Sequence, residues 1–155
     1  MIIGIDPGNE CSAWATMTAA GELVNHAKEA NNGIIGMIRH SVLAPMSTIV
    51  AIEMIASYGM PVGKEVFETC VWIGRFAEAW EQSGGKVRFI YRRDVKLHHC
   101  HNARANDANI RAALIDRYGP GKDKAIGTKK SPGPLYGIKA DVWSALAVAL
   151  TAAES

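Results

Sequence analysis

Three acidic residues stand in apolar surroundings, where a charged side chain is unusual. Asp6 ends an apolar run at the start of the chain, Glu53 is the only charge in a β-branched run, and Asp141 opens an almost uncharged segment. A buried carboxylate is costly unless another group compensates its charge, and a metal ion is one such group. Because hard cations such as Mg²⁺ prefer carboxylate oxygens, the three acids together indicate a metal site.

Each acid taken by itself also has a purely structural interpretation. Asp6 precedes a Pro-Gly pair and could open a turn through its side chain. Glu53 could lie on an edge strand and point to water. Asp141 falls in the first turn of an expected helix, where the helix dipole favours an anion.

The elements that must position these acids follow from the spacing of the apolar residues. The expected strands are 1–6, 11–18, 22–29, 48–55 and 86–91, and the expected helices are 33–43, 64–82, 93–98, 107–118 and one that begins near 140. The links between the first three strands are short, so those strands form an antiparallel meander. Strands and helices then alternate, which predicts one α/β domain over 1–155.

The ends of the later helices have recognisable signals. Asn106 is a suitable N-cap and Gly119 a suitable C-cap for the helix over 107–118. The segment 119–136 contains four Gly and three Pro and is expected to be an irregular loop. In the last helix small residues follow Asp141 on its own face, so that this face can approach a sheet closely.

Several short motifs, taken in their order along the chain, resemble one known family. They are GIDPG at 4–8, AIE at 51–53, the stretch from Val95-Lys96-Leu97 through Ala103-Arg104-Ala105 to Ile110, and an acid three residues before SALAVAL at 144–150. This set resembles the RuvC-like Holliday-junction resolvases of the RNase H-like superfamily, phage-type members included. The resemblance implies a five-stranded mixed sheet flanked by helices, with strands 1–3 antiparallel and the later strands parallel.

The resemblance also implies an activity. It is metal-dependent hydrolysis of phosphodiester bonds in Holliday junctions, with paired nicks made by a homodimer. Two Mg²⁺ ions about 4 Å apart, for which Mn²⁺ substitutes, activate a water and stabilise charge on the leaving oxygen. Asp6 would bridge both ions, and Glu53 and Asp141 would complete the metal site.

One position departs from the family pattern. Ser144 stands where the family usually has a fourth acid, three residues after the position that Asp141 matches. Asp107 is the alternative fourth catalytic acid, although its place at the start of a helix also suits a charge at a helix N-terminus. Whether Asp107 or Ser144 completes the site stays open at this point.

The charge distribution points to a polyanionic partner. Residues 1–85 have a balance of −5, residues 86–139 a balance of +9 and residues 140–155 a balance of −2. Such a one-sided block is typical of a nucleic-acid surface, although a merely solvated face is the alternative. The residues expected to bind four-way or branched DNA are Lys96, Arg104, Arg92, Arg93, Tyr58 and Met60. Tyr58 and Met60 would stack at the opened junction centre, and core packing is the other interpretation.

Composition narrows the class of protein. The hydrophobic fraction is 48% and no apolar run is long enough to span a bilayer, so we expect a cytoplasmic protein with no membrane partner. Cys11, Cys70 and Cys100 are odd in number and scattered, as in a reducing compartment. Two other functions remain possible: a nuclease for other branched DNA or RNA, and a catalytically silent junction-binding protein. An actin/Hsp70-like ATPase is not expected, because 155 residues leave no room for its second lobe.

Overall fold

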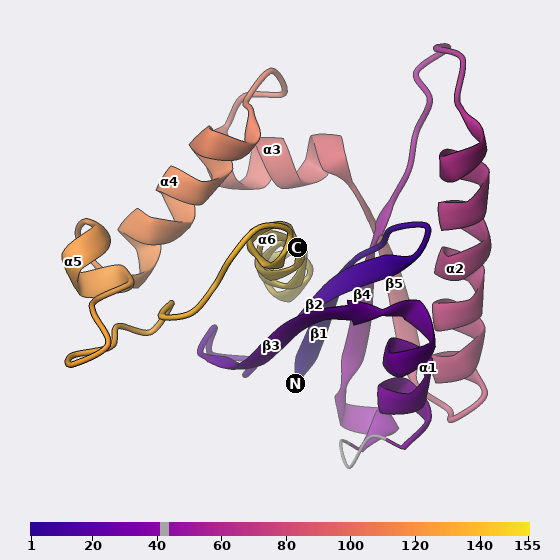
Figure 1. Cartoon of the computed structure of the whole chain (residues 1–155), viewed down its shortest axis with the longest axis horizontal. Coiled ribbons are helices and arrows are strands. Elements are labelled where there is room, and N and C mark those ends of the chain that lie inside the picture. Colours follow the sequence, from indigo (N-terminus) through magenta and orange to yellow (C-terminus); the bar gives the residue numbers. More distant parts are fainter. Residues whose placement is uncertain (41–43) are drawn as a thin grey trace.

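A computed structural model describes residues 1–40 and 44–155. Its centre is a mixed five-stranded sheet in the order β3-β2-β1-β4-β5 (Figure 1). The strands are β1 (Ile2–Asp6), β2 (Cys11–Met17), β3 (Leu23–Ala30), β4 (Ile49–Met54) and β5 (Lys86–Tyr91). β1, β2 and β3 pair antiparallel, whereas β4 is parallel to both β1 and β5. The predicted α/β class, the meander and the later parallel strands are thereby confirmed.

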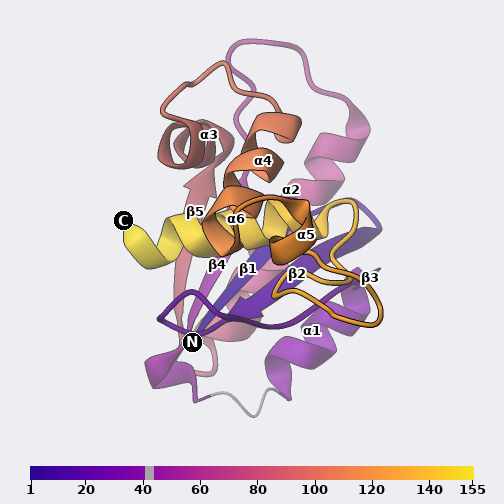
Figure 2. The ribbon, with the colours of Figure 1, turned by 90° about the vertical axis from the view of Figure 1, so that its left-hand side faces the viewer.

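Helices cover both faces of this sheet. They are α1 (Asn31–Arg39), α2 (Lys64–Glu81), α3 (Arg92–Cys100), α4 (Asp107–Tyr118), α5 (Lys122–Ala125) and α6 (Val142–Glu154), with a 3-10 turn η1 (Pro45–Ser47) before β4. α1 and α2 lie on one face, and α6 crosses the other, with α4 and α5 outside it (Figure 2). Each face has its own apolar core, around Trp80 and Phe76 on the first side and around Leu146 and Leu150 on the second.

The close approach of α6 to β1 depends on Gly4. A Cβ atom at this position would collide with the carbonyl oxygen of Ala145 and would lie 2.7 Å from the backbone nitrogen of Ala149. Ala145 and Ala149 are themselves fully buried. Three small residues therefore let the helix backbone lie directly on the strand, which brings the start of α6 beside the end of β1.

The expected elements differ from the observed ones mainly at their ends. α1 covers 31–39 instead of 33–43, of which 41–43 lie outside the described residues, and α3 is longer than the predicted 93–98. The segment 119–136 is not wholly irregular, because it contains α5. The last helix was expected to contain Asp141 in its first turn. In the structure α6 begins at Val142, and Asp141 is the residue before it. Such shifts arise because helix ends are set by local caps and tertiary contacts that apolar spacing does not encode.

The predicted ends of α4 are confirmed. The Asn106 side chain accepts from the Asn109 backbone N–H, and the Asn109 side chain accepts in return from the Asn106 backbone N–H. Gly119 is the C-cap. Across residues 1–40 and 44–155, none of the helices has both the length and the apolar character needed to cross a bilayer.

Candidate active site

Asp6 and Glu53 lie side by side because their strands are parallel neighbours. Ile5 of β1 is opposite Ile52 of β4, so the next residue of each strand is an acid at the same sheet edge. Burial is the largest influence on both carboxyls. It raises the pKa of Asp6 to about 7, with further contributions from the negative charges of Glu53 and Asp141, and it raises the pKa of Glu53 as well.

The turn that follows Asp6 is fixed by a buried polar network. The Ser12 hydroxyl donates to the Asn31 side-chain oxygen at 2.6 Å, and the Asn31 amide donates to the Gly8 carbonyl at 2.9 Å. The Gly8 N–H in turn donates to the Ser12 oxygen at 3.0 Å. Ser12 and Asn31 are each 1% exposed, so these bonds are shielded from water. The network anchors the Pro-Gly turn against β2 and α1 and so fixes the chain direction after Asp6.

Asp141 reaches the same region from the start of α6. It is the N-cap residue, but its side chain makes no capping hydrogen bond. Its carboxylate instead accepts from the Lys28 ammonium, with Lys28 Nζ 2.5 Å from Asp141 Oδ2. Asp141 therefore lies at the start of α6, where the helix dipole favours an anion, but its carboxylate pairs with Lys28 of β3 and does not act as a side-chain cap.

Arg92 joins the remaining polar groups. It is the first residue of α3, and its Nη1 atom lies 3.5 Å from Glu53 Oε1 and donates to the Ser144 hydroxyl oxygen at 3.4 Å. Its Nη2 atom pairs with Asp107, the first residue of α4. Arg92 was predicted as a DNA-binding residue, and the structure places it inside the acid cluster.

These side chains surround one open cleft of about 480 Å³. Its polar lining consists of Asp6, Glu53, Arg92, Asp107, Asp141 and Ser144, and Pro7, Met54, Ile55, Ala56 and Tyr58 supply the rest. Four carboxylates, an arginine and a serine, from five separate segments of the sequence, thus face one space. Asp107 and Ser144 both line the cleft, so the structure keeps both as possible completing groups.

The donor set suits a hard divalent cation. In the ranges 1–40 and 44–155, no three acidic, histidine or cysteine side chains are near enough to one another to hold an ion as they stand. Lys28 pairs with Asp141, and Arg92 pairs with Glu53 and Asp107, so three of the four acids already have a cationic partner. Asp6 has no ion pair among the described residues, although it is mostly buried beside two other acids. A carboxylate with that environment is the group that a bound Mg²⁺ or Mn²⁺ would compensate.

Of the other predicted DNA-binding residues, some line this cleft or the pocket beside it and others do not. Tyr58 and Met60 are each 70% exposed in the loop between β4 and α2, which excludes core packing for both. Tyr58 lines the cleft and has a backbone φ of +49°. Arg93 and Lys96 line a smaller adjoining pocket of about 310 Å³, which Tyr58 and Arg92 also border. Arg104 is exposed in the link between α3 and α4 and lines neither pocket.

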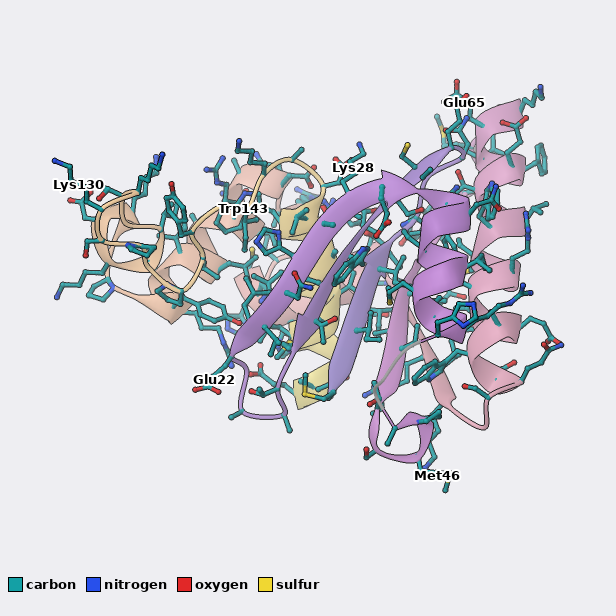
Figure 3. All side chains as sticks on the ribbon, turned by 60° about the horizontal axis from the view of Figure 1, so that its bottom comes forward. Glu22, Lys28, Met46, Glu65, Lys130 and Trp143 are labelled. Carbon is teal, nitrogen blue, oxygen red and sulfur yellow. The ribbon has the colours of Figure 1, made fainter. Side chains whose placement is uncertain are left out.

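Lys28 was not among the residues predicted from sequence. It lies on the edge strand β3, and Figure 3 labels it toward the end of that strand opposite Glu22. A single lysine on an amphipathic strand gives no signal of its own in the sequence. Only its 2.5 Å contact with Asp141, which is 113 residues away along the chain, identifies it.

The fold and the cleft define a class of architecture. An antiparallel three-stranded meander followed by alternating helices and parallel strands is the RNase H-like fold. Within that class the fold is that of the RuvC resolvases, as the following similarities to solved structures show.

The chain is similar to the structure of Thermus thermophilus RuvC, with a TM-score of 0.71 and 17% identity over 97% of this chain and 91% of that chain. It is also similar to T. thermophilus RuvC in complex with a Holliday-junction substrate, with a TM-score of 0.66 and 16% identity over 97% and 90%. No protein-family model matches the chain. No curated protein sequence matches it either.

Proposed function

We propose that this protein is a Mg²⁺-dependent endonuclease that cuts Holliday junctions. The observation that carries the proposal is the cleft in which Asp6, Glu53, Asp107 and Asp141 converge at the carboxyl ends of β1 and β4. The similarity in fold to a RuvC that is bound to a Holliday junction supports four-way DNA as the substrate.

The residues divide the chemistry among them. When bound, the divalent ions activate a water and stabilise the negative charge that develops on the leaving oxygen. Asp6, Glu53 and Asp141 would hold the ions, Mn²⁺ would be able to replace Mg²⁺, and the full complement would be two ions. Asp6 is suited to this role because burial, with the charges of Glu53 and Asp141, raises its pKa to about 7, and a bound cation would favour its charged form. Arg92 orients Glu53 and Asp107 through its two nitrogens.

An extended basic arm supplies a surface for the DNA phosphates. The arm is the segment 119–140, and it leads from α4 through α5 into Asp141. Its lysines are all exposed and, among the described residues, none forms an ion pair: Lys122, Lys124, Lys129, Lys130 and Lys139. Lys130 lies at the far end of the molecule (Figure 3). Unpaired lysines on a projecting segment suit contacts with the sugar-phosphate backbone.

Paired nicks in a four-way junction require two active sites, so we propose a homodimer. Phe67 and Val71 are 63% and 62% exposed, one helical turn apart on α2. A second copy of this chain is the occupant that we propose for this apolar face. Trp80 is fully buried in the core and takes no part in it, whereas Trp72 is partly buried with the Arg75 guanidinium stacked 4.0 Å from its ring centre.

The deciding experiment compares cleavage of a four-way junction with cleavage of a linear duplex of the same sequence, in Mg²⁺ and in EDTA. We expect paired nicks in the junction only and only with the metal. Asp6→Asn should abolish cleavage and leave the electrophoretic shift of the junction intact. A junction that is shifted but uncut by the unaltered protein in Mg²⁺ and in Mn²⁺ would favour the silent binding protein instead, and equal cutting of duplex RNA would favour the broader nuclease.

A further inference from the structure

Lys28 lies in one row with Asp6 across the sheet. Asp6 of β1 is directly opposite Ala13 of β2, and Ala13 is directly opposite Lys28 of β3. Residues opposite one another in antiparallel strands point to the same face of the sheet. The three side chains therefore share the face that α6 covers, and Ala13 belongs to the apolar core on that side.

The small residue in the middle of this row gives Lys28 access to the cleft. Adjacent strands are about 4.8 Å apart, so the backbone of Lys28 is roughly 10 Å from that of Asp6. Ala13 is fully buried and extends only one carbon above the sheet, which leaves the lysine chain free to pass over it. The ammonium ends on Asp141 Oδ2, where the bond to Asp141 and the charge of Asp6 raise the pKa of Lys28.

Lys28 and a metal ion thus compete for one carboxylate. The ammonium contacts Asp141, and a divalent ion that is held jointly by Asp6, Glu53 and Asp141 needs that same carboxylate. The Lys28–Asp141 pair is half exposed on both sides, so its strength is modest and an ion of twice the charge can displace it. A displaced Lys28 stays beside the cleft, because its strand is fixed along eight residues of β3.

We propose that Lys28 is a positioning residue that exchanges partners during the reaction. In the metal-free protein it holds Asp141, and when metal binds it releases Asp141 and contacts a phosphate of the bound DNA strand. The exchange keeps the acid cluster ordered before the ion arrives and provides a cation for the substrate afterwards. The inference rests on the proposed function in one respect, which is that Asp6, Glu53 and Asp141 are the metal ligands.

The test measures Mn²⁺ binding to the full chain by calorimetry in the absence of DNA. We expect Lys28→Met to bind Mn²⁺ about two- to fivefold more tightly than the unaltered protein, the range for loss of a half-exposed ion pair. Lys28→Arg keeps the charge and should bind Mn²⁺ as the unaltered protein does. Lys64→Met is the matched control, because Lys64 also pairs with an acid, Glu68 at 3.1 Å, but lies on α2 away from the cleft.

The second half of the exchange is tested with DNA. With the acid cluster unaltered, Lys28→Met should bind the four-way junction in Mn²⁺ more weakly than the unaltered protein does, as measured by stopped-flow anisotropy before cleavage takes place, and Lys28→Arg should restore binding. Unchanged or weaker Mn²⁺ binding by Lys28→Met would overturn the competition, and unchanged junction binding would overturn the phosphate contact. If Asp6→Asn and Asp141→Asn leave Mn²⁺ binding intact, the metal site itself is wrong and the proposed function fails with it.

Discussion

Gly4 of β1 lies directly against Ala145 of α6, and this contact sets how closely Asp141 approaches Asp6. The glycine is needed for space and not for its backbone conformation, since a Cβ atom would meet the backbone of the helix and not a flexible side chain. The separation of two proposed metal ligands therefore depends on a residue that carries no functional group.

We expect Gly4→Ala to lower the free energy of unfolding by about 1–3 kcal/mol, as overpacking does, and to abolish most cleavage by moving α6 outward. Thermal unfolding and junction cleavage measure the two effects. Gly36→Ala on α1 is the control, because a Cβ there meets nothing within 4 Å and alanine favours a helix, so stability should rise by up to about 1 kcal/mol. Full cleavage by Gly4→Ala would contradict the role of this contact.

The stability of the metal-free protein should fall as the pH rises from about 4 to about 7. The pKa of Asp6 is raised from 3.8 to about 7, so in this interval the folded protein holds a proton that the unfolded chain has released. The contribution is complete below pH 3.8 and is lost as the pH passes 7. Its size is up to about 4 kcal/mol, from 1.36 kcal/mol per unit of pKa.

Chemical denaturation in EDTA across this pH range measures the effect. Asp6→Asn removes the titrating group and should flatten the pH dependence and stabilise the metal-free protein at pH 8. Addition of Mn²⁺ should stabilise the unaltered protein most at high pH, where the carboxylates are charged. Equal slopes for the unaltered and Asp6→Asn proteins would mean that Asp6 is not the group responsible.

Asp107→Asn distinguishes the two candidates for the fourth group. If Asp107 acts as the fourth acid, its loss should reduce cleavage by at least about tenfold. Ser144→Asp in the same background should then restore part of the activity, because the Ser144 hydroxyl already lies 3.4 Å from Arg92 Nη1 in the cleft. Full cleavage by Asp107→Asn alone would show that Asp107 is not the fourth acid and that it serves only as a charge in the first turn of α4.

The tip of the basic arm should contribute to DNA affinity and not to catalysis. Lys129 and Lys130 lie in a turn closed by a bridge between Gly127 and Pro132. Replacing both with alanine should reduce the slope of log affinity against log salt by roughly 2, about one per phosphate contact. Fluorescence anisotropy with a labelled junction measures the slope. If the slope is as steep as that of the unaltered protein, Lys129 and Lys130 do not contact the DNA phosphates.

The order of elements and the line-up of Asp6 with Glu53 were predictable from the sequence. Asp6 is the last residue of β1 and Glu53 the last but one of β4, and parallel neighbours place their carboxyl ends at one edge, so local pattern and simple topology suffice. The Asn106 cap of α4 was predictable for the same reason, since both of its bonds join residues three apart. The orientation of the Asp141 carboxylate was not predictable from the sequence. A position at the start of a helix favours a side-chain cap, but the carboxylate instead binds Lys28, which is far away along the chain.

What the sequence by itself determined is therefore the set of acids and the elements that carry them, because apolar periodicity and chain direction are local properties. Only the tertiary structure decided which basic side chains pair with those acids. Lys28 reaches Asp141 from the edge strand β3, and Arg92 reaches Glu53, Asp107 and Ser144 from the start of α3. Contacts between residues far apart in the chain depend on sheet register and helix packing, and neither is written in the spacing of residue types.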